Sequence, residues 1–487
     1  MKLFDLETNG LLPTVTKVHC LVIKDRTTGQ KYRCIPAGFP MKADMTIEEG
    51  LELLKSGPIG GHNVIKFDLA VLQKLYPDFT YDKAQVFDTL VATRLIFTNL
   101  KDIDAGLLKK KRLPGSLFGS HKLEAWGYRL GLQKGEYVAD FKVRMGDAYV
   151  EGSEWHELSP EMLDYCDLDV EVTDALFSKI EAKEYSPLAL EIEHQIAWLM
   201  AQQVRNGFPF DAAKGAELYA KLAQRRGELE RALKDEFTFW FAPDGGVITP
   251  KLGNKTRGTV AGVPYQKIKV VEFNPSSRDH IADRLIKLYG WVPEVFTDGG
   301  KPKVDDEVMA KLDYPPAPLI TEFLMVQKRI SQLAEGDQAW LKVEQGGFIY
   351  GSINPNGAVT GRATHAYPNV AQVPAVGAPY GFESRSLFGV ESIRHIWPEA
   401  VQVGADASGL ELRCLAHFMA RYDGGKYGDV LLNGDIHWAN VQSMGLTDEA
   451  RDESNKLHKV YRDGGKTFIY GFLKSRGCTQ GWVQKTV

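Results

Sequence analysis

The pattern of apolar and polar positions predicts an α/β unit at the start of the chain. The first stretch carries short apolar runs separated by turn signals at Thr8-Asn9-Gly10 and Thr27-Thr28-Gly29, which is typical of short strands. Apolar residues then recur with helical spacing over 47–55, 83–97 and 159–183. Strands followed by helices indicate an α/β unit of about 185 residues.

The pattern becomes mostly helical after this unit. Segments 188–205 and 212–234 place charges on one face and predict an antiparallel helix pair, with Asp211 as the N-cap of the second helix. Residues 241–275 are rich in Gly, Pro, Lys and Thr, which predicts a loop or a small subdomain. Helical spacing returns over 278–289 and 305–335, and short strands and turns follow from residue 345.

Composition narrows the class of protein. The chain has 487 residues, 44% of them hydrophobic and 25% charged, which is ordinary globular composition and enough for roughly three domains. No apolar run reaches the length of about 18 residues that a membrane span needs. Five scattered cysteines fit neither a disulfide framework nor a zinc pattern, which favours a cytoplasmic setting. A net charge of −4 means that any DNA contact depends on local basic patches.

Two acids near the start form the first candidate site. Asp5 and Glu7 lie two positions apart on a predicted strand, so both carboxylates share one face while Phe4 and Leu6 take the other. Paired carboxylates suit hard divalent cations, which prefer oxygen ligands. The alternative for this pair alone is the solvated acidic face of an edge strand.

Two further acids and a tyrosine extend this site. Asp68 ends the run His62-Asn63-Val64-Ile65-Lys66-Phe67-Asp68, and Asp169 follows Tyr165 by four positions, which places both on one face of a helix. Taken singly, Asp68 could cap a helix and Asp169 could be a surface acid. Together, the three motifs in this order resemble the tyrosine-bearing branch of the DEDD exonuclease family.

The resemblance implies a ribonuclease H-like 3′→5′ exonuclease. In it Asp5, Glu7, Asp68 and Asp169 would hold two Mg²⁺ or Mn²⁺ ions, and Tyr165 would orient the attacking water. His62 and Asn63 would help to place the DNA end. The basic run from Lys109 to Arg112 is either a solvated charge run or a contact to single-stranded DNA.

A second candidate site begins at Asp406. An apolar strand predicted from Val401 to Ala405 ends at this acid, and Glu411 lies where the next helix begins. An acid near a backbone turn can hold the Mg²⁺ of a nucleotide, although it can also cap a helix. The segment resembles motif A of family A DNA polymerases. The resemblance implies that Asp406 is one of two metal-binding catalytic aspartates and that Glu411 excludes a ribose 2′-OH.

Two other sets of residues carry the same resemblance. Upstream, the segments that grip the primer–template would supply Arg362, Gln372 and Arg385. Downstream, Arg462, Lys466 and Tyr470 follow one another at intervals of four and form one helical stripe, typical of the fingers helix. With His437, the two cations would clamp dNTP phosphates and Tyr470 would lie near the incoming base. Without that context, each residue is an ordinary surface charge or turn residue.

The match runs from Met1 to Leu473 and is similar to the T-seven-type phage group. It implies an exonuclease at 1–187, a thumb at 188–340 with a short insertion at about 241–275, a partial palm and start of the fingers at 341–473, and an unmatched tail at 474–487. In that group a longer thumb insertion recruits host thioredoxin, so the short segment here argues against thioredoxin binding. The expected setting is the cytoplasm of an infected bacterial host.

The chain departs from the family after Leu473. Lys474-Ser475 replaces the Tyr-Gly of the pattern, and the His-Asp-Glu turn of motif C, with the second catalytic aspartate, is absent. An interruption of the gene after Leu473 is the hypothesis for this loss. We therefore expect Mg²⁺-dependent removal of nucleotides from DNA 3′ ends, and no nucleotide addition by this chain alone. The alternatives are the N-terminal half of a split polymerase, completed by a second chain, and a DNA-binding remnant.

Overall fold

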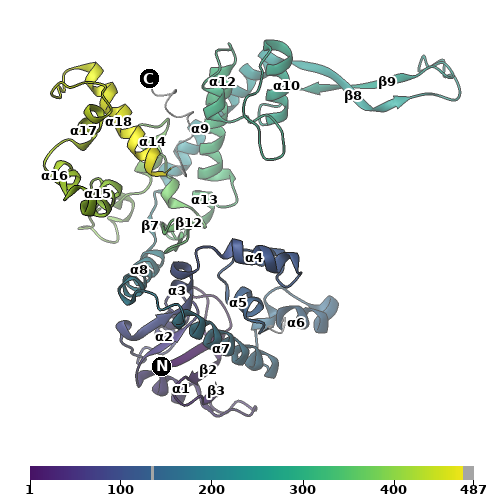
Figure 1. The fold of residues 1–487 in the computed structure, drawn as a ribbon. Helices are drawn as coiled ribbons and strands as arrows, with labels where there is room; N and C mark the ends of the chain where they lie inside the picture. The colour runs from purple at the N-terminus through teal and green to yellow at the C-terminus, as the bar shows by residue number, and fades with distance from the viewer. Residues whose placement is uncertain (133–136, 475–487) are drawn as a thin grey trace. The chain divides into compact units, whose positions relative to one another are not determined.

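The computed structural model describes residues 1–132 and 137–474, which fall into two compact units divided after Ala400. The first unit is mixed α/β, and the described part of the second is helical (Figure 1). None of the described helices has the combination of length and apolar character that crossing a bilayer requires. The α/β class expected from the sequence is confirmed.

A six-stranded sheet forms the centre of the N-terminal region, in the order β4-β3-β2-β1-β5-β6. Strand β1 lies inside the sheet, antiparallel to β2 and parallel to β5. Gly29 takes a φ of 75°, which allows the tight turn between β2 and β3. The strands are β1 (Lys2–Thr8), β2 (Val18–Asp25), β3 (Lys31–Ile35), β4 (Met45–Thr46), β5 (Ile59–Gly61) and β6 (Val86–Asp88).

Helices cover this sheet. The first and last, at 47–55 and 160–181, agree with the predicted segments, but 83–97 is not one helix. Asp88 ends β6 and accepts a hydrogen bond from the amide of Leu90, so it caps a shorter helix instead. The helices are α1 (Ile47–Lys55), α2 (Asp68–Leu75), α3 (Thr89–Ile96), α4 (Leu100–Lys109), α5 (Leu123–Leu130), α6 (Tyr137–Met145) and α7 (Pro160–Glu181).

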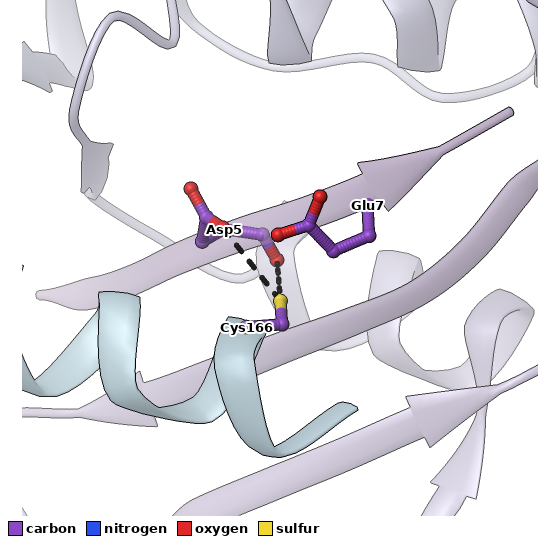
Figure 2. Close-up of side chains that lie close together, drawn as sticks. All are labelled: Asp5, Glu7 and Cys166. Carbon is purple, nitrogen blue, oxygen red and sulfur yellow. Dashed lines mark hydrogen bonds between the residues drawn. The ribbon is translucent and has the colours of Figure 1, made fainter. Parts of the chain in front are cut away.

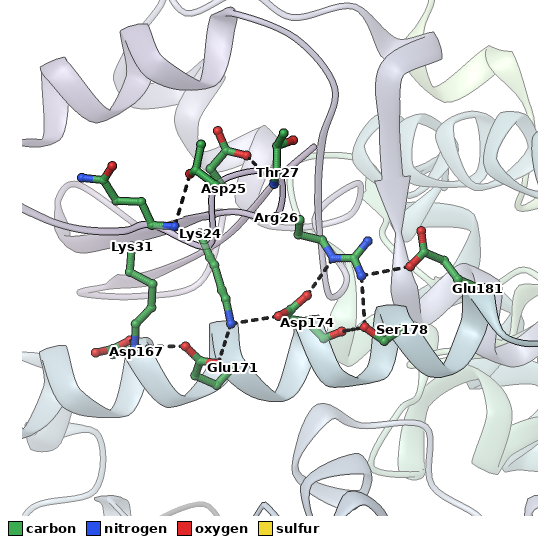
Figure 3. Close-up of polar contacts among 12 residues, drawn as sticks. Lys24, Asp25, Arg26, Thr27, Lys31, Asp167, Glu171, Asp174, Ser178 and Glu181 are labelled. Atoms are coloured by element: carbon green, nitrogen blue, oxygen red, sulfur yellow. Dashed lines mark hydrogen bonds and ion pairs between the residues drawn. The ribbon is translucent and has the colours of Figure 1, made fainter.

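Ion pairs hold α7 against the sheet (Figure 3). The Nζ of Lys24 lies 2.7 Å from Glu171 and 2.8 Å from Asp174, while the Nε of Arg26 lies 2.7 Å from Asp174. Lys31 adds a contact of 2.5 Å to Asp167. Because these cations come from β2, β3 and the turn between them, they fix the rotation of α7 relative to the sheet.

The rest of the first unit is mainly helical. Asp211 caps α9 by accepting a hydrogen bond of 3.0 Å from the amide of Lys214, as expected. The elements are α8 (Pro187–Asn206), β7 (Phe208–Pro209), α9 (Ala212–Phe237), β8 (Phe239–Ile248), β9 (Tyr265–Glu272), α10 (Arg278–Tyr289), α11 (Asp306–Met309), α12 (Ala317–Ile330), a π-helical turn (Ser331–Glu335), α13 (Trp340–Val343), β10 (Phe348–Ile349), β11 (Ser352–Asn354), β12 (Thr364–Ala366) and α14 (Gly381–Ser386).

The predicted antiparallel pair of α8 and α9 is wrong. Ala197 and Ala201 of α8 are buried in the core of the N-terminal sheet, whereas α9 packs against α12 through a separate apolar core. Between the two helices, β7 pairs with β10, which redirects the chain. Amphipathic spacing identifies the buried face of a helix but does not identify its partner.

Two other segments differ from their predictions. Within 241–275 the chain forms a two-stranded hairpin of β8 and β9, which extends from α10 (Figure 1). The helix expected over 305–335 is divided into α11, α12 and the π-helical turn, because Pro315 and Pro316 interrupt its amide hydrogen bonds.

The described part of the second unit is α15 (Leu410–Asp423), α16 (Lys426–Asn433), α17 (Ile436–Ser443) and α18 (Lys456–Lys474). The strand predicted from Val401 to Ala405 does not form, and Val401 and Val403 are 76% and 84% exposed. A strand needs a hydrogen-bonded neighbour, and no strand among the described residues lies beside this segment. The unmatched tail beyond Lys474 lies outside the described residues.

One buried ion pair gives a direct test of this packing. Asp104 is fully buried on α4 and accepts two hydrogen bonds from Arg129, at 2.9 and 2.8 Å, and one of 2.7 Å from the amide of Gly119. We expect Asp104→Ala to lower the free energy of unfolding by about 3–5 kcal/mol, because the Arg129 guanidinium would remain buried without its counter-ion.

Scanning calorimetry of the variant measures this loss, with Asp102→Ala as the matched control. Asp102 lies on the same helix but is exposed, so its removal should change stability by no more than about 0.5 kcal/mol. The Arg129 contacts hold the pKa of Asp104 below its usual range, so the stabilisation is present above the unfolded pKa and is lost as the pH falls. Equal stability of the two variants would contradict the assigned role of the pair.

Candidate functional site

Asp5 and Glu7 come together on one face of β1, where both are half-buried (Figure 2). Their carboxylate oxygens and the Sγ of Cys166, from α7, all lie within 4.8 Å of one another. Phe4 and Leu6 point the opposite way and are buried, as the alternation along the strand predicts. Because β1 is an inner strand, the alternative of a solvated edge-strand face does not apply.

Cys166 was not anticipated, and its chemistry decides which ligands this cluster offers. Its Sγ lies 3.4 Å from the carbonyl oxygen of Asp5 and 3.7 Å from Asp5 Oδ2, so the thiol is placed to donate to the acid. Burial raises the pKa of Cys166 well above its usual value, which keeps the sulfur protonated. The donors that remain are carboxylate oxygens, which fit Mg²⁺ or Mn²⁺ better than a thiophilic metal.

Asp68 reaches the same strand from the first turn of α2. The side chain is buried and accepts a hydrogen bond from the amide of Leu6, the residue between the two acids of β1. Burial, together with the neighbouring Asp88, raises the pKa of Asp68 to about 7. A divalent ion would therefore displace a proton from Asp68 at neutral pH.

Asp88 is a second residue that the sequence did not single out. Its carboxylate accepts hydrogen bonds from the amides of Asn63 (2.9 Å) and Ile65 (3.1 Å), and its own amide donates to His194 on α8. Asp88, at the end of β6, thus fixes the loop that leads to Asp68. His62 contacts Thr89, the first residue of α3, through Nδ1 at 2.9 Å, so this helix also fixes the histidine.

Tyr165 and Asp169 both come from α7, but Tyr165 packs beside Tyr137 and Trp155 and does not line the pocket that Asp169 enters. Burial raises the pKa of Tyr165, and the charges of Asp169, Glu7 and Asp5 raise it further, so the phenol stays protonated. Asp169 is buried and lines the same pocket as Asp5. Asp5 and Glu7 share a tight cluster, while Asp68 and Asp169 approach β1 from the flanking helices.

A pocket of about 1150 Å³ opens beside these acids. Its wall includes the half-buried cations Lys66 and Arg94 and, from later in the chain, Tyr350 and Asn354. Lys66 donates to the hydroxyl of Ser352 at 2.8 Å, whereas the guanidinium of Arg94 has no hydrogen-bond or ion-pair partner within the described ranges. Neither cation was anticipated, because each is an isolated charge in an ordinary helix or loop.

The described part of the second unit brings His437, Arg462, Lys466 and Tyr470 to one helix pair, α17 and α18. The rings of His437 and Tyr470 are 6.1 Å apart, and Arg462 donates through Nε to Asp435 at 2.7 Å. Burial lowers the pKa of His437, as do the charges of Arg462 and Lys466, so its imidazole is neutral at pH 7. The helical stripe predicted from the sequence is therefore formed.

The other candidate residues do not form one cluster. Asp406 is exposed in an irregular segment, not at the end of a strand, and Glu411 lies in the first turn of α15 as expected. Arg385 is exposed and donates through Nε to the carbonyl of Pro374 at 2.8 Å. Arg362 and Gln372 are exposed near turns, and Lys110, Lys111 and Arg112 are exposed beyond the end of α4.

Comparison with known proteins identifies the class. Residues 253–473 match the family described as DNA polymerase family A. Over 97% of its length the chain is 45% identical to the DNA-directed DNA polymerase of Escherichia phage T7, covering 75% of that protein. The chain therefore belongs to DNA polymerase family A. The resemblance to family A DNA polymerases drawn from the sequence is thereby confirmed.

Two other relatives agree with the assignment. The chain is also 45% identical to the DNA-directed DNA polymerase of Enterobacteria phage T3, with 98% of this chain and 76% of that protein aligned. DNA polymerase I of Aquifex aeolicus is 25% identical, with 94% and 70% aligned. These relationships support an enzyme of the DNA polymerase class, which carries out template-directed nucleotidyl transfer in phage DNA replication.

The oxygen-ligand interpretation of the first site predicts different effects of two neighbouring substitutions. Asp5→Asn should weaken Mn²⁺ binding to the full chain by tenfold or more, because it removes an anionic oxygen ligand, whereas Cys166→Ala should leave binding within about twofold. Titration calorimetry with Mn²⁺ measures both. A large loss in the Cys166 variant would show that the sulfur is a ligand.

Proposed function

We propose that this chain is a family A DNA polymerase whose 1–187 region is a ribonuclease H-like 3′→5′ proofreading exonuclease. The observation that supports the proposal is the cluster of Asp5 and Glu7 on β1, with Asp169 in the same pocket as Asp5 and Asp68 hydrogen-bonded to the amide of Leu6 between the two acids. Residues 188–340 would form the thumb, and residues 341–473 part of the palm and the start of the fingers. The substrate would be a DNA primer–template, with dNTPs as the second ligand.

The four acids would hold two divalent ions, which, when bound, activate a water and stabilise the attacking and leaving oxygens of the phosphate. Tyr165 stays protonated, so it would orient the attacking water as a hydrogen-bond donor and not as a base. Cys166 keeps its proton and supports the position of Asp5. Lys66 and Arg94 line the route to the acids and would hold the phosphates of the strand.

We propose a separate dNTP site on α17 and α18. Arg462 and Lys466 would bind the triphosphate with the neutral imidazole of His437, and Tyr470 would lie near the base. Asp406 would hold one of the two Mg²⁺ ions, with Glu411 against the sugar. Arg362, Gln372 and Arg385 would contact the duplex. One catalytic aspartate does not complete a two-metal centre, so this polypeptide alone would not extend a primer.

An assay of the purified chain on a labelled primer–template tests both activities. With Mg²⁺ we expect shortening of the primer from its 3′ end, and with added dNTPs we expect no extension. Asp5→Asn should lower the cleavage rate by at least about a hundredfold, because it weakens metal binding at the reacting centre. Extension would refute the second expectation. Binding without cleavage would favour a DNA-binding remnant, and extension on addition of a polypeptide with motif C would favour a split polymerase.

The pocket beside the acids predicts an effect of Arg94 on the same reaction. Arg94→Met should raise KM for single-stranded DNA by about 10- to 100-fold and change kcat less, because a phosphate contact in a partly desolvated pocket is lost. Arg231→Met, an exposed arginine on α9, is the matched control and should change neither constant. The proposal that Arg94 binds the strand fails if both variants keep the original KM.

A further inference from the structure

A single carboxylate joins the two helices of the proposed dNTP site. Asp435 Oδ1 accepts hydrogen bonds from the amides of His437 (3.1 Å) and Trp438 (3.2 Å) and so caps α17. Its Oδ2 accepts from Arg462 Nε on α18 at 2.7 Å and from Arg451 at 2.5 Å. The same side chain therefore fixes the backbone beside His437 and the side chain of Arg462.

Arg462 contacts Asp435 through Nε, which leaves its two terminal guanidinium nitrogens available to a ligand. Only Nε donates to Asp435, and no partner of the two terminal nitrogens lies within the described ranges. The helices also approach closely: a Cβ on Gly465 would lie 3.1 Å from the carbonyl oxygen of His437 and 2.8 Å from Val441. This close approach keeps α17 and α18 at a fixed separation. Asp435 on α17 can therefore fix the direction of the Arg462 side chain on α18.

We propose that Asp435 is the positioning residue of the triphosphate site, aiming the terminal nitrogens of Arg462 at the phosphates while fixing the backbone next to His437. The proposal rests on the assignment of Arg462 and His437 to dNTP binding. A guanidinium held at Nε presents its two remaining nitrogens as a planar fork, which matches two oxygens of a phosphate. Asp435 itself need not touch the nucleotide.

The charges around Asp435 are compatible with an anionic ligand. The carboxylate alone would repel a triphosphate, but it is paired with both Arg451 and Arg462. Arg451 also pairs with Glu453 at 3.2 Å, so these four groups balance and the excess positive charge comes from Lys466. Lys466 lies one turn further along α18 and is exposed. Arg451 thus neutralises Asp435 while Arg462 stays available for phosphate.

The decisive variant is Asp435→Asn, because asparagine caps a helix about as well as aspartate but does not hold two arginines by charge. Titration calorimetry of the full chain with dATP and Mg²⁺ gives the affinity. We expect Asp435→Asn to weaken binding about five- to tenfold, with little change in Tm. Asp448→Asn, which removes an exposed carboxylate from the same unit, should leave the affinity unchanged.

A double-mutant cycle separates this inference from the function on which it rests. If Asp435 acts through Arg462, Asp435→Asn should have no further effect in the Arg462→Met background. Weaker binding in Arg462→Met but unchanged binding in Asp435→Asn would overturn the positioning role alone, as would additive losses. If the unaltered chain does not bind dATP, or if Arg462→Met binds it normally, the dNTP assignment fails and the inference fails with it.

Discussion

The geometry of the exonuclease candidate depends on how α7 is held against the sheet. Lysines of β2 and β3 and an arginine of the turn between them pair with acids along one side of α7, and this fixes which side chains of the helix meet β1. Cys166 then lies against Asp5, and Asp169 enters the pocket beside it. The partners are partly exposed, so each pair stabilises the fold only modestly. Together, these ion pairs fix the rotation of α7 about its own axis.

The two candidate sites differ in how their charged side chains are compensated. In the first, acids lie on and beside β1, and burial together with Asp88 raises the pKa of Asp68, which favours its protonated form. In the second, Asp435 and Glu453 together balance the charges of Arg451 and Arg462. The first arrangement is suited to cations and the second to an anion, as proofreading metals and an incoming triphosphate would require.

Residues from later in the chain also line the pocket beside the first candidate site. Lys66 donates to Ser352, and Tyr350 and Asn354 complete a wall of the pocket. A DNA 3′ end bound in this pocket would contact residues that precede α8 in the sequence and residues that follow it. The buried alanines of α8 make this possible, because they bring the helix that follows the N-terminal region onto its core.

The sequence by itself determined the alternation of β1, the ends of α1, α7 and α10, the cap at Asp211 and the stripe on α18, because short-range spacing and capping govern each of them. Motif order was also enough to identify the polymerase family. Only the tertiary structure decided that α8 and α9 separate and that 401–405 is not a strand. It also placed Cys166, Asp88, Arg94 and Asp435 beside the candidate residues. These outcomes depend on partners distant in sequence, which no local pattern specifies.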